Sequence, residues 1–213
     1  MTGIPRFYLI SDRRRMGCDP IAAVSAMARA GLPAFQWREK DLAAIQIYEA
    51  AQAFVASFRA QGSPTQLLVS DRVDIALAIG CGVHLPEGGL PTRIARALLP
   101  AGALLLRSTH SLAGAERARD EGADAVTFSP VFDTASKRAF GPPQGLASLQ
   151  RVCEALAPFP VLALGGITLE RTAACLDAGA HGVAVIGAVW DAADPAEAAR
   201  KFAALCVPRP AAS

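Results

Sequence analysis

Short apolar runs alternate with longer amphipathic stretches along the chain. The short runs are nearly continuous in hydrophobicity, a pattern typical of parallel strands that are covered by helices. The longer stretches are rich in Ala, Leu, Arg and Glu, which favour helices. Eight of the short runs are predicted to be strands: Phe7–Ser11, Ala34–Trp37, Leu67–Ser70, Gly82–Leu85, Ala103–Arg107, Ala123–Phe128, Pro160–Leu164 and Gly182–Ile186.

A helical stretch, or a loop that leads into one, follows each predicted strand, for example at Pro20–Ala30, Leu42–Arg59 and Ala113–Glu121. Eight such units in 213 residues predict an α/β fold, a single (β/α)8 TIM barrel. The alternative is an open doubly wound sheet, but no Gly-x-Gly-x-x-Gly turn follows the first strand to support its dinucleotide-binding form. We expect one domain over residues 1–213, with a frayed tail over residues 208–213.

The composition excludes several classes of protein. Hydrophobic residues make up 52% of the chain, and 21 Lys and Arg against 19 Asp and Glu give a formal net charge of +2. A disordered chain would be poorer in apolar residues, and a nucleic-acid binder would carry a basic excess. We find no apolar run of the roughly 18 residues that span a membrane and no secretory signal core, so we expect a cytoplasmic protein. The five cysteines form no Cys-x-x-Cys pair, which argues against disulfide or zinc sites and favours buried thiols.

Polar residues gather just past the ends of the predicted strands. In a barrel these ends share one face, and that face holds the active site. Gln36, Arg38 and Lys40 alternate along the end of the second strand, so they lie on one side of it. Two cations on the inner side favour an anion such as phosphate or pyrophosphate. The alternative is a salt-bridged strand end in which Glu39 pairs with a neighbour.

The third, seventh and eighth strands also end in candidate residues. Asp71 follows the third strand, where it is either a Mg²⁺ ligand shared with substrate phosphate oxygens or the N-cap of the next helix. The backbone amides of Gly165-Gly166 and Ile186-Gly187 are candidates for a phosphate site, because many barrels bind phosphate after these two strands. A tight turn is the alternative for the glycine pair.

Two further segments offer side chains of uncertain role. Thr134 and Lys137 lie in a long loop that ends in Gly-Pro-Pro, and Lys137 is either a contact to a leaving phosphate or part of a solvated basic loop. His110 is either a base or an ordinary histidine beside a helix-capping serine. We expect His84 to point inward and to be structural.

Seven motifs together carry a family resemblance. In order, they are FYLISDR, FQWREKD, LLVSDRVDIALAIGCGVHLPE, STHS, FSPVFDTASK, LALGGIT and GVAVIGAVW. The series resembles that of thiamine phosphate synthase and its TenI-type thiazole tautomerase relatives, from about Phe7 to Leu205. The resemblance implies a TIM barrel that joins hydroxymethylpyrimidine pyrophosphate to thiazole phosphate by a dissociative step and releases pyrophosphate. It also implies Mg²⁺ as cofactor and small phosphorylated substrates as partners, without nucleic acid or membrane; a homo-oligomer is left open.

The resemblance also implies roles for residues. Gln36, Arg38 and Lys40 correspond to contacts with the pyrimidine and the pyrophosphate, and Asp71 corresponds to a Mg²⁺ ligand. Ser108 and Lys137 correspond to pyrophosphate contacts, and Gly166, Ile186 and Gly187 to the thiazole-phosphate cradle. The full assignment is catalytic roles for Arg38, Lys40 and Lys137, substrate binding by Gln36, Ser108, His110, Thr134, Gly165, Gly166, Ile186 and Gly187, and metal binding by Asp71.

Four departures from the family pattern keep two other activities open. Ser70 replaces an Asn, Gly187 replaces a Ser, and the segment Pro86–Gly89 lacks the family's second Mg²⁺-binding Asp, with Glu87 two residues before its place. These losses resemble the tautomerase branch, which isomerises a thiazole carboxylate phosphate without metal. The tautomerase's catalytic His is also absent, because Pro130 stands in its motif. The alternatives are therefore a TenI-type tautomerase and a non-catalytic barrel that binds thiazole or thiamine phosphate.

Overall fold

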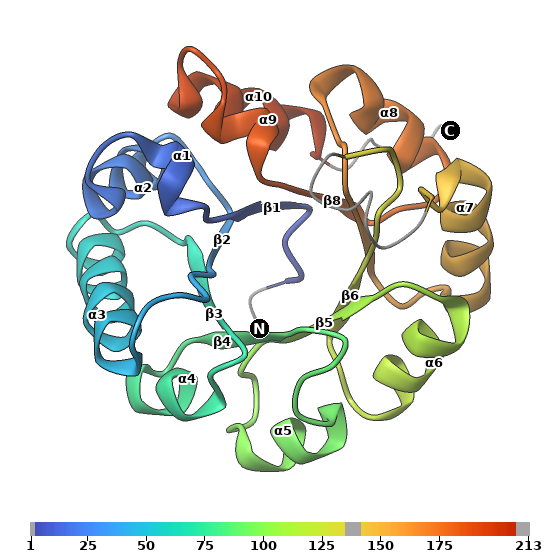
Figure 1. Ribbon diagram of the computed structural model, residues 1–213, viewed down its shortest axis with the longest axis horizontal. Helices are drawn as coiled ribbons and strands as arrows, with labels where there is room; N and C mark the ends of the chain where they lie inside the picture. The colour runs from blue at the N-terminus through green and yellow to red at the C-terminus, as the bar shows by residue number, and fades with distance from the viewer. Residues whose placement is uncertain (1–2, 135–141, 208–213) are drawn as a thin grey trace.

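Eight parallel strands close into a barrel in the computed structural model, which describes residues 3–134 and 142–207. The strands pair in chain order, and the first pairs with the last through Phe7 with Val183 and Leu9 with Val185 (Figure 1). This closure confirms the predicted (β/α)8 barrel and excludes the open sheet. The strands are β1 (Phe7–Ile10), β2 (Ala34–Trp37), β3 (Gln66–Ser70), β4 (Gly82–Leu85), β5 (Leu105–Thr109), β6 (Ala125–Phe128), β7 (Val161–Leu164) and β8 (Gly182–Val185).

Helices surround the barrel on its outer side (Figure 1). They are α1 (Arg13–Met16), α2 (Pro20–Arg29), α3 (Ala44–Ala60), α4 (Val73–Ile79), α5 (Thr92–Leu98), α6 (Leu112–Asp120), α7 (Gly145–Leu156), α8 (Leu169–Asp177), α9 (Gly187–Trp190) and α10 (Pro195–Leu205). The sequence pattern did not predict the one-turn helices α1 and α9, which follow β1 and β8. Lys137 and the predicted tail over residues 208–213 lie outside the described residues.

Alternate residues of each strand face opposite sides of the barrel wall and build two cores. The larger core lies between the strands and the helices. The smaller core fills the lumen and includes Tyr8, Leu68, Leu106 and Leu162, with Ile4 of the N-terminal segment packed against it. Polar side chains follow these residues toward the carboxyl ends of the strands, so the chemistry is confined to one end of the barrel.

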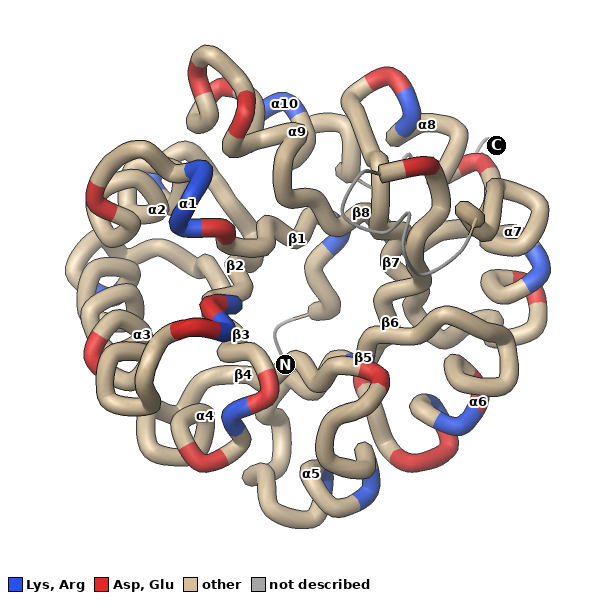
Figure 2. Tube along the Cα trace, in the orientation of Figure 1, with Lys and Arg blue, Asp and Glu red and all other residues tan. Residues whose placement is uncertain are grey.

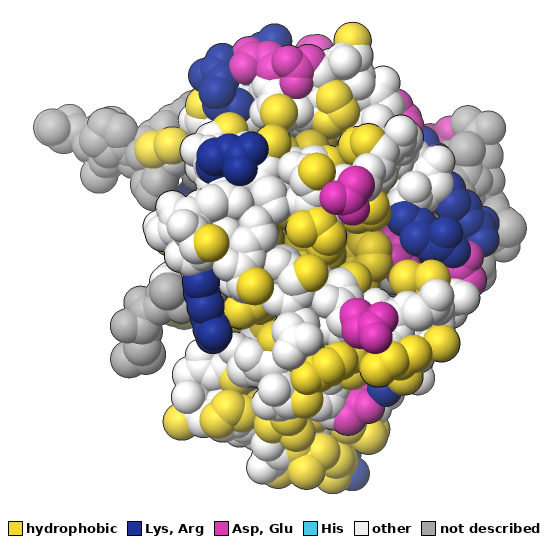
Figure 3. Space-filling view, turned by 90° about the vertical axis from the view of Figure 1, so that its left-hand side faces the viewer, with side chains coloured by type: hydrophobic (Ala, Val, Ile, Leu, Met, Phe, Trp, Pro, Cys, Tyr) yellow, Lys and Arg dark blue, Asp and Glu magenta, His cyan; other side chains and the backbone are white. Residues whose placement is uncertain are grey.

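Charged positions lie mainly on the helices and where strands leave the barrel, whereas the wall itself is largely uncharged (Figure 2). Among the described residues, none of the helices is both long and apolar enough to cross a bilayer. The outer face in Figure 3 shows apolar side chains interspersed with charged ones. Exposed large apolar residues include Ile45, Leu77, Leu98 and Val207.

The last helix packs against the first strand. The rings of Phe7 on β1 and Phe202 on α10 stack with their centroids 5.4 Å apart, and both side chains are fully buried. Because α10 also contacts α2, α8 and α9, this pair joins the two ends of the chain on the outer side of the barrel.

We therefore expect Phe202→Ala to lower the free energy of unfolding by about 3–5 kcal/mol, the usual cost of deleting a buried aromatic side chain. Urea unfolding followed by circular dichroism measures it. The neighbouring Lys201→Ala, on the exposed side of the same helix, should change the free energy of unfolding by no more than about 0.5 kcal/mol. Equal effects of the two substitutions would contradict the proposed packing.

Candidate active site

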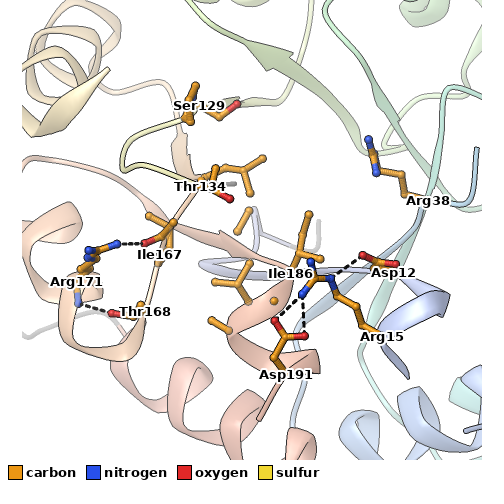
Figure 4. A pocket seen from close by; sticks show the side chains of 18 of the residues that line it. Asp12, Arg15, Arg38, Ser129, Thr134, Ile167, Thr168, Arg171, Ile186 and Asp191 are labelled. Carbon is orange, nitrogen blue, oxygen red and sulfur yellow. Dashed lines mark hydrogen bonds and ion pairs between the residues drawn. The ribbon is translucent and has the colours of Figure 1, made fainter. Parts of the chain in front are cut away.

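A cavity of about 790 Å³ opens at the carboxyl ends of the strands, among the loops that follow β1, β2, β6, β7 and β8 (Figure 4). Its size lies within the range of small-molecule sites. Seven of the predicted site residues line it: Arg38, Lys40, Thr134, Gly165, Gly166, Ile186 and Gly187. The predicted residues Gln36, Asp71, Ser108 and His110 lie outside its lining.

Arg38 and Lys40 present two cations just after β2, at the wall of the cavity. Arg38 is half-buried and Lys40 is exposed, and both line the cavity. In the described part of the chain, neither side chain has a hydrogen-bond or ion-pair partner. Two such cations suit an anion, and anion binding at this place stays a prediction.

Glu39, which lies between these two cations in the sequence, bonds to the loop after β1. Its Oε1 accepts hydrogen bonds from Ser11 Oγ at 2.6 Å and from the backbone N–H of Arg13 at 3.0 Å. Ser11 Oγ in turn accepts the backbone N–H of Arg38 at 2.7 Å. Glu39 therefore does pair with neighbours, but on the loop after β1, and this pairing fixes the backbone from which Arg38 projects. Oε2 of Glu39 also lies 3.7 Å from Nε of Arg13, as the salt-bridge alternative expects, and anion binding by Arg38 and Lys40 stays a prediction.

Polar side chains fill the lumen beneath the cavity. Gln36 is only 2% exposed, and its amide has no hydrogen-bond partner among the described residues. The Gln36 amide is therefore free to bond to a ligand that reaches the lumen. His84 points inward as predicted, and its ring bonds to Tyr8 and Ser108. Burial, and then the charges of Arg38 and Arg107, lower the pKa of His84 to about 3, so the imidazole is neutral.

The turn after β7 requires its two glycines. Gly165 and Gly166 have φ angles of 98° and 63°, in the left-handed region that favours glycine. A Cβ on Gly165 would lie 2.7 Å from the Cα of Pro130, and one on Gly166 would lie 2.7 Å from the carbonyl oxygen of Asp133. The amides of both glycines have no acceptor among the described residues, so they are free to bind an anion at the cavity wall.

The sequence analysis missed four charged residues that line the cavity: Asp12, Arg15, Arg171 and Asp191. Arg15 donates to Asp191 at 2.6 and 2.8 Å and to Asp12 at 2.9 Å, which ties the loop after β1 to α9 (Figure 4). Arg171 lies on the opposite side of the cavity from Arg38 in this view, donates to the carbonyl of Gly166 at 2.8 Å and covers the ring of Phe132. Asp12 stood at a predicted strand end, whereas Arg15 and Arg171 lie on helices and Asp191 directly follows α9, so these three gave no signal.

Asp71 does not cap a helix, so that alternative was wrong. The N-cap of α4 is Arg72, and it makes no side-chain capping bond. Asp71 has a φ of 58°, a left-handed conformation that Asp tolerates, while its N–H donates to the carbonyl of His84 at 3.0 Å. Its exposed carboxylate has no hydrogen-bond or ion-pair partner among the described residues, so it is available to a cation.

His110 is held from one side. Its Nδ1 donates to the carbonyl of Ser129 at 2.6 Å, because a carbonyl oxygen only accepts. Its Nε2 then faces Glu87 Oε2 at 3.9 Å. The structure thus places Glu87 beside His110, and a substrate contact by His110 stays a prediction.

Comparisons with known proteins identify the family. The model of the family described as thiamine monophosphate synthase matches residues 7–189. The chain belongs to the thiamine monophosphate synthase family. A thiamine-phosphate synthase of Anaeromyxobacter dehalogenans is 43% identical over 189 residues, covering 88% of this chain and 83% of that protein. One of Roseiflexus castenholzii is 40% identical over 201 residues, covering 93% and 86%. The solved structure of a thiamine phosphate pyrophosphorylase from Pyrococcus furiosus superposes with a TM-score of 0.83 at 30% identity, covering 94% and 95%.

By the motif resemblance, Gly89 of this chain stands where the family has its second metal-binding Asp. A Cβ at Gly89 would lie 2.6 Å from Asp71 Oδ1, so the carboxylate of Asp71 fills the space beside this glycine. The described residues hold no cluster of three or more His, Cys, Asp or Glu side chains that would bind a metal by themselves. Mg²⁺ is commonly held by one or two carboxylates together with substrate phosphates, and the single unpartnered carboxylate of Asp71 fits that mode.

By the motif resemblance, Gly187 stands where the family has a Ser after β8. A Cβ at Gly187 would lie 2.8 Å from Asp191 Oδ2 and 3.5 Å from a guanidinium nitrogen of Arg15. A serine here would therefore require the carboxylate of Asp191, which is bonded to Arg15, to shift. The glycine at position 187 therefore lies beside Arg15 and Asp191, two of the charged residues that the sequence analysis missed.

We expect Arg38→Ala to weaken the binding of inorganic pyrophosphate by roughly 10- to 150-fold, the loss of one charge-assisted contact of about 1.5–3 kcal/mol. Isothermal titration calorimetry measures the dissociation constant. Arg14→Ala is the matched control, because Arg14 lies on the same end of the barrel but is paired with Asp41. Binding that is unchanged in Arg38→Ala, or equally weakened in Arg14→Ala, would refute the anion site.

The environment of Glu39 leads to a prediction about how the free energy of unfolding depends on pH. Burial raises its pKa above the ordinary 4.5, outweighing the hydrogen bonds from Ser11 and Arg13. The folded state therefore keeps this proton to a higher pH than the unfolded chain. The stability that protonation contributes is complete below pH 4.5 and is lost as the pH rises through the raised value.

In Glu39→Gln this loss should be absent. The free energy of unfolding of the wild type minus that of the variant should consequently fall with rising pH across this window. Urea unfolding at closely spaced pH values measures the difference, and a rise with pH would contradict the assignment.

Proposed function

We propose that the protein is a thiamine-phosphate synthase, which joins hydroxymethylpyrimidine pyrophosphate to thiazole phosphate and releases pyrophosphate. The observation that carries this proposal is the pair of cations at a cavity of about 790 Å³, Arg38 and Lys40, which have no counter-ion in the part of the chain that the structure describes. A pyrophosphate leaving group is the substrate feature that such a pair suits. Membership of the family and the relatives named thiamine-phosphate synthase support the same reaction.

The reaction exchanges one bond for another. The bond between the pyrimidine methylene carbon and the pyrophosphate oxygen breaks, and its electron pair leaves with pyrophosphate. The thiazole nitrogen then forms the new bond to that carbon. Since negative charge develops on the leaving oxygen, preorganised cations stabilise the transition state more than the ground state. We assign this role to Arg38 and Lys40, and assign to Lys137 the contact that family resemblance implies.

Other residues bind and orient the two substrates. The partnerless amide of Gln36 suits the polar edge of the pyrimidine, and the hydroxyl of Ser108 suits a pyrophosphate oxygen. The amides of Gly165 and Gly166, with the segment Ile186-Gly187, suit the phosphate of the thiazole. Asp71 would hold Mg²⁺, which supplies positive charge to the leaving pyrophosphate when bound.

A coupled assay for thiamine phosphate formation tests the proposal, with both substrates and with or without Mg²⁺. We expect Mg²⁺-dependent turnover, and Asp71→Ala should lower kcat/KM by roughly a hundredfold or more, because a metal is worth several kcal/mol of charge stabilisation. Asp74→Ala is the matched control, since that exposed carboxylate is already paired with Arg72.

Three results would overturn parts of the proposal. Conversion of thiazole carboxylate phosphate without metal, and without thiamine phosphate formation, would indicate the tautomerase. Binding of thiazole phosphate without either turnover would indicate a binding barrel. Metal-independent formation of thiamine phosphate would refute only the role of Asp71.

A further inference from the structure

A chain of hydrogen bonds crosses the lumen beneath the cavity. The hydroxyl of Tyr8 on β1 lies 3.1 Å from Nδ1 of His84 on β4, and Nε2 of His84 lies 3.0 Å from Oγ of Ser108 on β5. The rings of Tyr8 and His84 stack with centroids 5.6 Å apart. Tyr8 is fully buried and His84 is 2% exposed, so solvent does not supply other partners.

Only one direction of donation satisfies the buried atoms. The described residues offer the Tyr8 hydroxyl a single partner, Nδ1 of His84. If Nδ1 carried the proton, Tyr8 would accept it, and the phenolic proton would be buried without an acceptor. If Tyr8 donates instead, the neutral imidazole carries its proton on Nε2.

The proton on Nε2 then goes to Ser108. Oγ of Ser108 lies 3.0 Å away, whereas the hydroxyl of Thr127 lies at 3.5 Å from the same nitrogen. Once Ser108 accepts this bond, its own hydroxyl proton has no acceptor among the described residues. The oxygens of a pyrophosphate are acceptors that suit such a proton.

We propose that Tyr8 and His84 are positioning residues that turn the Ser108 hydroxyl into a hydrogen-bond donor toward the pyrophosphate of the substrate. The proposal rests on the proposed function. With the opposite tautomer, Ser108 would give its proton to Nε2 and present lone pairs to an anion. The order of donation from Tyr8 through His84 to Ser108 therefore decides whether Ser108 attracts or repels the leaving group.

Pyrophosphate binding tests the chain of donors without turnover. In calorimetric titrations of the full-length protein with inorganic pyrophosphate, Ser108→Ala should weaken binding by about tenfold, the size of one hydrogen bond to a charged group. Tyr8→Phe, which removes only the hydroxyl, should weaken binding by a similar factor. The double variant should bind no more weakly than Ser108→Ala, because Tyr8 acts only through Ser108. Independent losses that multiply to about a hundredfold would overturn the proposal.

Two substitutions of His84 separate positioning from packing. The amide nitrogen of Gln reaches the place of Nε2, whereas that of Asn does not, so His84→Gln should keep pyrophosphate affinity within about threefold and His84→Asn should match Ser108→Ala. Equal losses in both variants would overturn the proposal. Nitrogen-15 spectra of the histidine rings provide a readout on the wild type itself: His84 should carry its proton on Nε2, and a proton on Nδ1 would refute the order of donation.

The same variants in the synthase assay distinguish failure of the donor chain from failure of the synthase proposal. Tyr8→Phe should lower kcat by about tenfold and leave the KM for thiazole phosphate within about twofold, since its effect is on the leaving group. If the wild type forms thiamine phosphate but the losses in the variants are additive, the synthase proposal is supported and the proposed role of Tyr8 and His84 is refuted. Failure of the wild type to form thiamine phosphate, with the expected pyrophosphate binding and tautomer, would refute the synthase but keep the donor chain.

Discussion

The ladder between β1 and β8 joins the first strand of the chain to the last, and the whole site depends on that closure. All eight strands are parallel, so a closed barrel brings their carboxyl ends to one rim. Residues separated by most of the sequence then become neighbours, as Arg15 and Asp191 do. Closure also gives every strand an inner side, where Tyr8, His84 and Ser108 meet across the lumen.

Two cations and a carboxylate at the end of β2 illustrate how the site keeps its charges available. Adjacent Arg, Glu and Lys side chains would neutralise one another on a flexible surface. Here Oε1 of Glu39 accepts hydrogen bonds from Ser11 and from the backbone of Arg13, and its Oε2 lies 3.7 Å from Nε of Arg13. Glu39 therefore bonds to the loop after β1 and does not neutralise Arg38 and Lys40.

Much of the fold could be predicted because apolar continuity and glycine-terminated helices are local signals. The fifth strand was the least accurate: it begins at Leu105 rather than Ala103, because Gly102 in a left-handed conformation keeps Ala103 in a turn that bonds to Pro100. Ser108 consequently belongs to the strand and faces the lumen, instead of following the strand end.

The site was predictable only in part, for a physical reason. Arg38, Lys40 and the glycine pair follow strands directly, so the barrel alone places them at the cavity. Arg15 and Arg171 reach it from helices and Asp191 from the end of α9, so their positions depend on how these helices pack and on the bonds between them. The partner of a carboxylate is likewise a tertiary property, which is why the sequence left Asp71 undecided between cap and ligand.

The contact between Gly89 and Asp71 has a consequence for mutagenesis. A Cβ at position 89 would lie 2.6 Å from Asp71 Oδ1, so an acid introduced there would require the carboxylate of Asp71 to leave its present rotamer. Substitutions at the two positions are therefore expected to be non-additive, and a double-mutant cycle, rather than either single variant, would measure what each carboxylate contributes.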